Sequence, residues 1–146
     1  MSEIKFGTDG WRAVIADTFT TANVKRVAQA TAWWIKEKFP ENPTVVIGHD
    51  CRFGGDMFAK TTAQVMAYEG IHAYVGEGFS STPMVSLGVA KYEASAGVVI
   101  TASHNPPSYN GFKVKAHYGG PATPAMVEEV EQQVPETFKE IGRAHV

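Results

Sequence analysis

Cysteine is nearly absent from this sequence, which contains a single one, Cys51, among 146 residues. One cysteine cannot form an internal disulfide framework or supply the ligands of a cysteine-rich zinc site. A large excess of charge is also lacking, because 13 Lys and Arg residues nearly balance 15 Asp and Glu residues and leave a formal net charge of -2. The sequence therefore has no excess of positive charge that would favour binding to nucleic acid or to an anionic membrane surface.

Long apolar segments are missing as well. No run approaches the length of a membrane span, and the first ten residues, MSEIKFGTDG, lack the hydrophobic segment of a secretory signal. We therefore expect a cytoplasmic protein without nucleic-acid or membrane partners. Because Gly/Ser linkers and internal repeats are absent too, residues 1–146 are expected to form a single domain, large enough to bury about 70% of the surface of the unfolded chain.

Hydrophobic periodicity predicts helices that alternate with short apolar strands. The expected helices are 20–39, 56–69, 82–92 and one beginning near 123, in which Pro135 would kink or restart the helix. The expected strands are 44–48, 71–75, 97–101 and 111–115. Intervening helices favour parallel pairing, whereas the short connection before 111–115 favours an antiparallel strand. The predicted fold class is α/β, a three-layer α/β/α sandwich with a mixed, mostly parallel four-stranded sheet.

The expected helices carry recognisable capping and surface signals. Thr20 is expected to cap the first helix, and Thr82, with Pro83 at the first helical position, is expected to cap the third. The last helix is rich in glutamate, which we interpret as a solvated face formed by Glu128, Glu129, Glu131, Glu136 and Glu140.

Three loops follow predicted strands at the edge of the sheet where α/β proteins gather their ligands: 49–55, 76–82 and 102–110. The third contains Ser103 ahead of Pro106 and Pro107, which fix φ and stiffen the turn. A stiff loop at the end of a buried strand can hold a nucleophile without the entropy cost of a flexible segment. Composition alone also allows a turn without chemistry, because these residues are common turn formers.

Other catalytic motifs are incomplete. Ser103 and His104 would point to opposite sides of an extended chain, and the glycine-flanked nucleophile elbow of hydrolases is absent. The segment 54–60 has no second glycine before its lysine, so it does not form a P-loop. The segment 76–81 carries serine where a dinucleotide fingerprint has its third glycine. A hydrolase, a P-loop enzyme and a dinucleotide-binding protein are therefore disfavoured.

Three motifs resemble those of the α-D-phosphohexomutases, the family of phosphoglucomutase and phosphomannomutase. TASHNPPSYNGFKV at 101–114 is similar to the phosphoserine loop of that family, FGTDGWR at 6–12 to its amino-terminal signature, and DCR at 50–52 to its Asp-x-Arg element. The resemblance covers essentially the whole chain, as the first of four domains, so the later domains would be absent from this chain. Pro107 and YNGF at 109–112 favour the phosphoglucomutase/phosphomannomutase branch over the phosphoglucosamine mutases.

The resemblance implies a Mg²⁺-dependent isomerase of the intramolecular phosphotransferase type. It would interconvert hexose 1-phosphate and hexose 6-phosphate, of glucose or mannose, through a hexose 1,6-bisphosphate, with glucose 1,6-bisphosphate as activator. Ser103 would carry the phosphoryl group and bind Mg²⁺ through one phosphate oxygen. The implied partners are a hexose phosphate and the remaining domains of the same polypeptide. Two other interpretations stay open: a non-catalytic sugar-phosphate or anion-binding module, and a phosphoglucosamine mutase domain.

The resemblance also implies roles for other residues near Ser103. Lys113 would act as the acid and base for the sugar hydroxyl, and Arg12 would stabilise the phosphoryl charge with its planar fork of donors. His104 and Asn105 would line the phosphate as part of the loop. A lysine on an edge strand and an arginine near the amino terminus are otherwise ordinary surface residues, so these roles depend on the motifs.

Other charged residues are expected to be structural. Asp9, Asp50 and Arg52 would tie the loops together. The aspartate-rich metal loop of the family has no counterpart here, because the aspartates of this sequence, Asp9, Asp17, Asp50 and Asp56, are far apart. We therefore expect the isolated chain to fold and to turn over no sugar phosphate.

Overall fold

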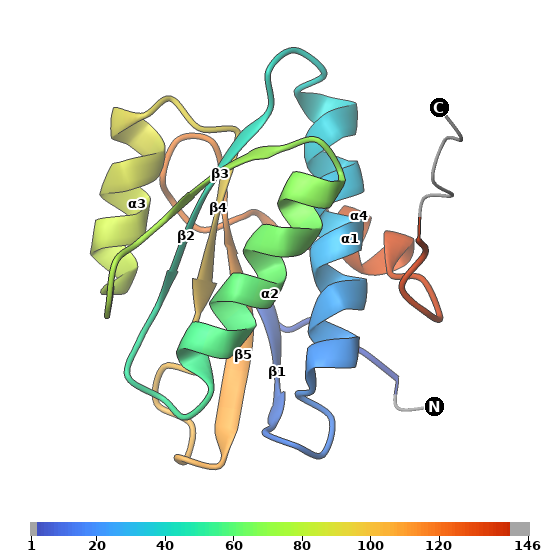
Figure 1. The fold of residues 1–146 in the computed structure, drawn as a ribbon, viewed down its shortest axis with the longest axis vertical. Helices are drawn as coiled ribbons and strands as arrows, with labels where there is room; N and C mark the ends of the chain where they lie inside the picture. The colour runs from blue at the N-terminus through green and yellow to red at the C-terminus, as the bar shows by residue number, and fades with distance from the viewer. Residues whose placement is uncertain (1–2, 141–146) are drawn as a thin grey trace.

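The computed structural model describes residues 3–140, which are organised around one five-stranded sheet (Figure 1). The elements follow one another as β1 (Gly10–Val14), α1 (Thr21–Lys38), β2 (Thr44–His49), α2 (Gly55–Tyr68), β3 (His72–Val75), α3 (Thr82–Lys91), β4 (Ala96–Ile100), β5 (Tyr109–Lys115) and α4 (Pro124–Gln133). The predicted alternation of strands and helices from the first helix onward is confirmed. None of the described helices is both long and apolar enough to cross a membrane.

The sheet is mixed, as predicted, and has the order β1-β5-β4-β2-β3. The strand β2 is parallel to β3 and to β4, whereas β5 is antiparallel to β4 and to β1. The prediction of four strands is wrong, because Gly10–Val14 forms a fifth, β1, at one edge. Trp11 and Ala13 alternate with the less buried Arg12, which is the pattern of a strand with one face in the core.

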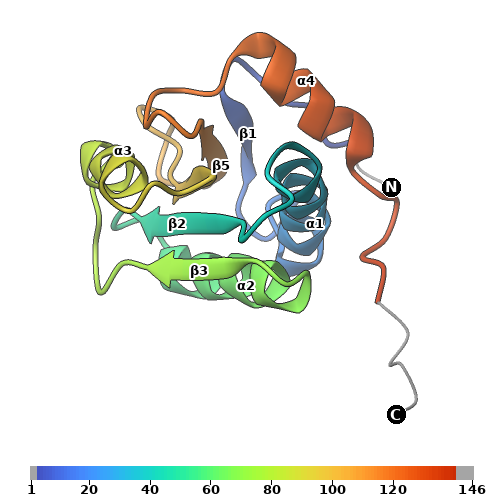
Figure 2. The same ribbon diagram turned by 90° about the horizontal axis from the view of Figure 1, so that it is seen from above.

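The helices cover both faces of the sheet (Figure 2). α1 and α2 pack on the face that carries the main hydrophobic core, and α3 packs on the other face against β2 and β4. In β5, Phe112 and Val114 belong to the main core, so alternation places Lys113 and Lys115 on the α3 side of the sheet. The predicted three-layer α/β/α class is confirmed.

An aromatic cluster anchors the edge strand β1 to the core. The ring of Trp11 stacks on Phe19 with centroids 4.6 Å apart, and Phe19 meets Phe58 of α2 edge to face at 4.8 Å. Such aromatic pairs contribute about 0.5–1.5 kcal/mol each beyond the burial of their area. The strand that carries Arg12 is thereby fixed to α2, far from it in the sequence.

Two predicted details of the helices are wrong. The cap of α3 is Ser81, whose extended backbone lets its hydroxyl accept from the Met84 N–H at 3.3 Å, and Thr82 is already the first helical residue. Pro135 neither kinks nor restarts α4, because the helix ends at Gln133 and the described residues that follow are not helical.

The glutamates of α4 do not form one solvated face. Glu129 accepts a hydrogen bond from Trp34 Nε1 at 2.7 Å, and Glu131 accepts one from the backbone N–H of Phe6. Glu128 is exposed, as expected. The solvated-face prediction is therefore correct for Glu128, Glu136 and Glu140, which are exposed, and incomplete for Glu129, whose side chain is 45% exposed but also bonds α1. It is wrong for Glu131, which fastens α4 to the amino-terminal segment.

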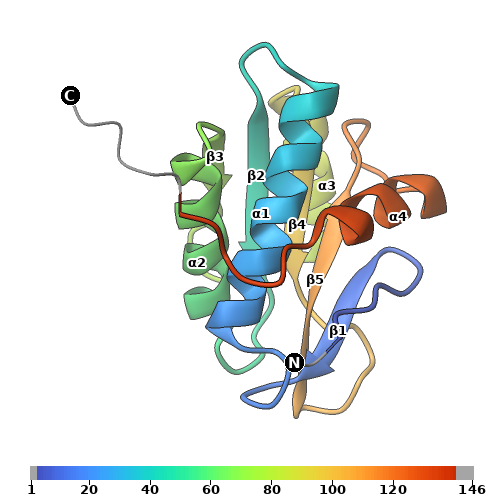
Figure 3. The same ribbon diagram turned by 90° about the vertical axis from the view of Figure 1, so that its right-hand side faces the viewer.

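Residues 135–139, which we call the strap, lie across α1 (Figure 3). Arg26 Nε donates to the Pro135 carbonyl at 2.7 Å. The side chain of Gln29 donates to the Lys139 carbonyl at 2.7 Å and accepts from the Lys139 N–H at 2.8 Å. Gln29 is fully buried and also donates to Glu69 at 2.9 Å, so both the nitrogen and the oxygen of its amide are satisfied.

Candidate functional site

The loop between β4 and β5 is built on the buried residue Thr101. The Thr101 N–H donates to the Gly111 carbonyl at 3.0 Å, which closes the base of the loop. Its hydroxyl accepts from the Ser103 N–H at 3.2 Å and donates to Asp50 Oδ2 at 2.6 Å. Two further backbone hydrogen bonds, from Asn105 to Ala102 at 3.0 Å and from Tyr109 to Pro106 at 2.9 Å, fold the loop into consecutive turns.

Ser103 is exposed at the first turn and has a left-handed backbone, with φ of 52°. Non-glycine residues adopt this conformation at a cost of about 1–2 kcal/mol, so the surrounding contacts must impose it. The chain at Ser103 is therefore not extended, and the extended-chain argument that separated Ser103 from His104 is wrong. The absent nucleophile elbow remains the argument against a hydrolase.

One guanidinium group holds the loop in place. Arg52 Nη1 donates to the carbonyls of Pro106 at 2.8 Å and Tyr109 at 3.0 Å. Arg52 Nη2 donates to the carbonyls of Ser103 at 2.9 Å and Asn105 at 2.7 Å. Four backbone carbonyls of the loop thus converge on the single side chain of Arg52.

Asp50 orients the guanidinium group that holds the loop. Its Oδ1 accepts from the Arg52 N–H at 3.0 Å, and its Oδ2 lies 3.7 Å from Arg52 Nε and accepts from the Thr101 hydroxyl. The expected tie between the loops is confirmed for Asp50 and Arg52. The sequence did not indicate that the acceptors would be carbonyls of the Ser103 loop.

Arg12 reaches the same loop from β1. Its backbone pairs with Gly111 of β5, and its Nη1 donates to Asn105 Oδ1 at 3.0 Å. Two of the predicted site residues, Arg12 and Asn105, are therefore in direct contact. Gly111 leaves room for this approach, because a Cβ there would lie 3.0 Å from Arg12 Cγ and 2.4 Å from the Thr101 carbonyl oxygen.

Lys113 lies two residues farther along β5 and pairs with Asp9. Its Nζ is 3.3 Å from Asp9 Oδ2, and both side chains are largely buried. Gly10 lets Asp9 come this close, because a Cβ on Gly10 would overlap the Phe112 carbonyl oxygen at 2.2 Å. Asp9, which the sequence indicated only as structural, thus neutralises a candidate catalytic lysine.

Lys115 was missed by the sequence analysis. It is 6% exposed, and burial lowers the pKa of its ammonium below the ordinary value of 10.5, with a further decrease from Lys113 and an opposing increase from Asp9. The alternation Lys113-Val-Lys115 was a signal that could have placed both lysines on one face of the strand.

The remaining predicted site residue, His104, is exposed beside Ser103. Within residues 3–140, no group of three or more His, Cys, Asp or Glu side chains could hold a metal ion. Ser103 is the one predicted metal-binding position, and a single oxygen ligand does not make a Mg²⁺ site. The described residues therefore do not fit Mg²⁺ by themselves.

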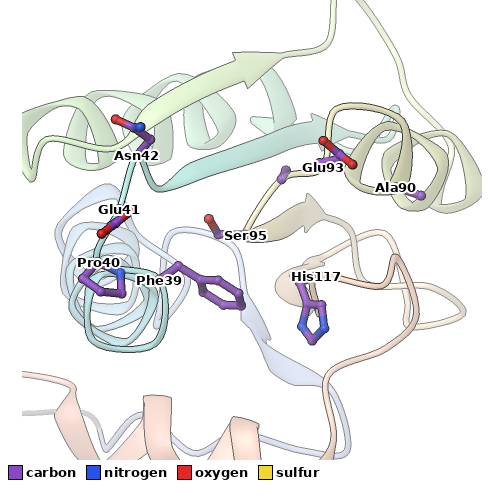
Figure 4. Close-up of a pocket in the computed structure, with 9 residues that line it drawn as sticks. Phe39, Pro40, Glu41, Asn42, Ala90, Glu93, Ser95 and His117 are labelled. Atoms are coloured by element: carbon purple, nitrogen blue, oxygen red, sulfur yellow. The ribbon is translucent and has the colours of Figure 1, made fainter.

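Two pockets help to delimit the site. One of about 400 Å³ is lined by residues 5–10 and Arg12, next to the Asp9–Lys113 pair. Another of about 570 Å³ includes Phe39, Ser95 and His117 (Figure 4) and contains none of the predicted site residues. Arg12 thus contacts the loop that carries Ser103, His104 and Asn105, whereas Lys113 lies farther along β5 and pairs with Asp9 beside the start of β1.

Comparison with known proteins places this arrangement in context. Residues 3–140 match the model of "Phosphoglucomutase/phosphomannomutase, alpha/beta/alpha domain I". A phosphoribomutase of Saccharomyces cerevisiae is 40% identical over 119 residues, which cover 77% of this chain and 19% of that protein. A phosphoglucomutase of Staphylococcus haemolyticus is 34% identical over 136 residues, which cover 91% of this chain and 25% of that protein.

A solved structure shows the same fold. The crystal structure of a "putative phosphomannomutase" from Thermus thermophilus superimposes with a TM-score of 0.91 at 38% identity, covering 96% of this chain and 32% of that one. The chain therefore spans between 19% and 32% of the length of these three relatives.

Proposed function

Since this chain belongs to the phosphoglucomutase/phosphomannomutase family, whose α/β/α domain I it matches, we propose that it is the phosphoserine-bearing domain of a sugar-phosphate mutase. The relatives are phosphomutases by name, so the family is enzymatic. The proposed reaction interconverts hexose 1-phosphate and hexose 6-phosphate through a hexose 1,6-bisphosphate. The observation that carries the proposal is the exposed, left-handed Ser103 on a loop held by Arg52.

The proposed transfer passes the phosphoryl group between Ser103 Oγ and a sugar hydroxyl. The hydroxyl oxygen attacks phosphorus and the bond from phosphorus to Oγ breaks. The Lys113 ammonium gives a proton to the departing Oγ and takes up the proton of the attacking hydroxyl. After the bisphosphate turns around, Ser103 Oγ attacks the other phosphate, its proton passes to Lys113, and Lys113 gives a proton to the departing sugar oxygen. Serine is thereby phosphorylated again, and atoms and charge balance over the cycle.

Arg12 is proposed to stabilise the transferring phosphoryl group. Its bond to Asn105 uses one of five donors and fixes the guanidinium beside the loop. His104 is proposed to donate a hydrogen bond to a phosphate oxygen. Arg52 has a different role, because it positions Ser103 through the backbone and its terminal nitrogens are engaged by carbonyls.

Mg²⁺ is the proposed cofactor, with a phosphate oxygen on Ser103 as the ligand that this chain supplies. The ion would neutralise charge on the phosphoryl group during transfer. Because the described residues hold no cluster of carboxylates that could bind it, the other ligands are proposed to come from further domains of the same polypeptide. Glucose 1,6-bisphosphate is the proposed activator, and the cytoplasm the proposed location.

The sugar is proposed to be glucose, mannose or both. One relative is named a phosphoribomutase, so pentose phosphates belong in the same assay. The second candidate function, a sugar-phosphate-binding module without catalysis, would use the same cationic groups. It differs in one respect, because such a module would leave Ser103 unmodified.

The decisive experiment locates the phosphate. The mutase that contains this domain is incubated with glucose 1,6-bisphosphate, and the modified residue is mapped by mass spectrometry. We expect phosphate on Ser103, none on the Ser103→Ala variant, and normal labelling of Ser108→Ala, a matched control for an exposed serine of the same loop. Phosphate on another residue, with full activity of Ser103→Ala, would overturn the assignment.

Lys113 is tested in the same protein. Removal of a general acid and base costs about 10²- to 10⁴-fold in rate, so Lys113→Met should lower kcat by that factor. Lys91→Met, at the exposed end of α3, serves as the control. A kcat within about twofold of the unaltered enzyme would leave Lys113 as an ordinary strand lysine.

The isolated chain is expected to fold without turning over sugar phosphate. A cooperative denaturation curve would show folding, and a coupled mutase assay with Mg²⁺ and the bisphosphate would test activity. The assay is repeated with the remaining domains added in trans. Turnover by the chain alone would require a metal site that the described residues do not form.

A further inference from the structure

The ammonium of Lys115 is a partly buried cation to which no described residue is bonded. The residue is 6% exposed, and its side chain forms neither a hydrogen bond nor an ion pair with any residue from 3 to 140. Among the described residues no fully buried side-chain nitrogen lacks a partner, so the end of the Lys115 side chain keeps contact with water. An ammonium that is partly withdrawn from water is stabilised by a nearby carboxylate. The lowered pKa of the Lys115 ammonium is caused first by burial and then by the charge of Lys113. The neighbourhood of Lys115 indicates which group its ammonium can pair with.

Asp9 lies between Lys113 and Lys115. Its carbonyl accepts from the N–H of Val114 at 3.0 Å, so its backbone stands opposite the residue that separates the two lysines. Its carboxylate is 3.3 Å from Lys113 Nζ, and its charge also raises the pKa of Lys115. One carboxylate is therefore within electrostatic reach of two ammonium groups and bonded to only one of them.

The stem of Lys115 is fixed, whereas its end is available. A Cβ on Gly97 would lie 3.1 Å from Lys115 Cβ and close to Val85 and Val89 of α3, so the strand and the helix pack closely around the first part of the side chain. The ammonium, which no described residue binds, is the part that can accept a new partner.

We propose that Lys115 is the alternative ion-pair partner of Asp9, which leaves Lys113 for Lys115 when an oxyanion binds Lys113. The oxyanion is a phosphate monoester, and the inference rests on the proposed phosphate-facing role of Lys113. Lys115 is a positioning residue here, since it acts through Asp9 and does not touch the phosphate.

Charge explains why the exchange is needed. With Asp9 bonded to Lys113, an incoming phosphate would meet a carboxylate at the position where it needs a cation, and the two anions would repel each other. Transfer of Asp9 to Lys115 frees the Lys113 ammonium without leaving the carboxylate unpaired. Lys113, Lys115 and Arg12 carry three positive charges against the one negative charge of Asp9, so the group is complementary to a phosphate dianion.

Inorganic phosphate is the probe, and the 146-residue chain is the protein. The lysine side-chain resonances are followed by NMR during a phosphate titration, with chloride matched for ionic strength. We expect phosphate to perturb Lys113 and to raise the pKa of Lys115, because Lys115 gains the carboxylate. Lys115→Met should weaken phosphate binding about two- to fivefold, the effect of one partly exposed ion pair. Lys115→Arg should retain the affinity, and Lys91→Met should leave it unchanged.

A double-mutant cycle separates the exchange from simple loss of charge. In the Asp9→Asn background there is no carboxylate to move, so Lys115→Met should no longer change the phosphate affinity. An equal loss in both backgrounds would mean that Lys115 acts directly on the anion and would overturn the proposal. Unchanged binding by Lys115→Met, or no phosphate binding by the unaltered chain, would overturn it as well. The proposed function fails separately, in the mapping of phosphate on Ser103.

Discussion

The Ser103 loop and the strap are both irregular segments whose backbones are bonded by polar side chains from other parts of the chain, by Arg52 in the loop and by Gln29 and Arg26 in the strap. Arg52 donates to four carbonyls of the loop, and Gln29 both donates to and accepts from the backbone of Lys139. The loop stays exposed at Ser103, whereas Gln29 is fully buried beneath the strap.

The difference follows from what each side chain can bond. A guanidinium only donates, so it suits a loop that turns its carbonyls inward and its side chains outward. An amide donates and accepts, so it suits a segment that runs past it as a neighbouring strand would. The donors of Arg52 thus shape the segment where chemistry is proposed. In the strap, Arg26 bonds one carbonyl, and only Gln29 both donates to and accepts from the backbone.

The largest effect is expected from Arg52→Met, which removes the support of the loop. A nucleophile displaced by about 1 Å can lose about 10²-fold in rate, so phosphorylation of Ser103 should fall by at least that factor. Arg52→Lys should restore little, because one ammonium cannot reach carbonyls on both sides of the loop. The initial rate of phosphate incorporation measures the effect, and a rate equal to that of the unaltered protein would show that the loop holds its shape without Arg52.

Gln29→Leu should have the opposite profile. It leaves the Lys139 backbone groups and part of Glu69 without their partner, which should lower the free energy of unfolding by about 1–3 kcal/mol. Urea denaturation measures this change, and Gln132→Leu on the exposed side of α4 is the control. Phosphorylation of Ser103 should stay unchanged; if both quantities fell together, the loop and the strap would not be independent.

Ser103→Gly tests the strain in the loop. Glycine adopts the left-handed backbone of position 103 freely, and its greater entropy in the unfolded chain offsets part of the gain. We expect a net stabilisation of about 0.5–1 kcal/mol. Ser108→Gly, in the same loop but without positive φ, should give no stabilisation in the same denaturation experiment. Equal effects of the two substitutions would contradict strain at Ser103.

The smallest effect is expected at Glu129, whose carboxylate bonds Trp34 and Lys38 of α1. Hydrogen bonds from Trp34 and then from Lys38 lower its pKa below the ordinary value of 4.5. The unfolded chain therefore binds the proton first, so the stabilisation is complete above 4.5 and is lost as the pH falls through the lowered pKa. The stability of Glu129→Gln should converge with that of the unaltered chain at acid pH, as followed by Trp fluorescence. A constant difference at all pH values would contradict this origin.

Much of the fold could be predicted because local patterns specify it. The apolar runs of β2 and β4 and the capped helices are visible in short windows of sequence. β1 was missed because Gly10–Val14 is short and contains Arg12, and its identity as a strand depends on pairing with β5, far away in the chain. The strap was missed for the same reason, since Gln29 and Lys139 are distant in sequence.

The site residues that belong to sequence motifs could be predicted, whereas those that are brought to the site only by tertiary packing could not. The motifs singled out Ser103, Arg12 and Lys113, and the contact between Arg12 and Asn105 brings two motifs together. Their catalytic roles stay predictions. Lys115 was missed because its burial comes from α3 and from the close approach of Gly97, neither of which leaves a local signal.

The four bonds of Arg52 also determine how the loop can move. Its acceptors are spread from Ser103 to Tyr109, so the loop cannot open as a lid unless all four bonds break together. Ser103 would therefore keep a fixed position throughout the proposed cycle. In that case the bisphosphate would have to reorient between the two transfers, because Ser103 itself does not move to meet its second phosphate.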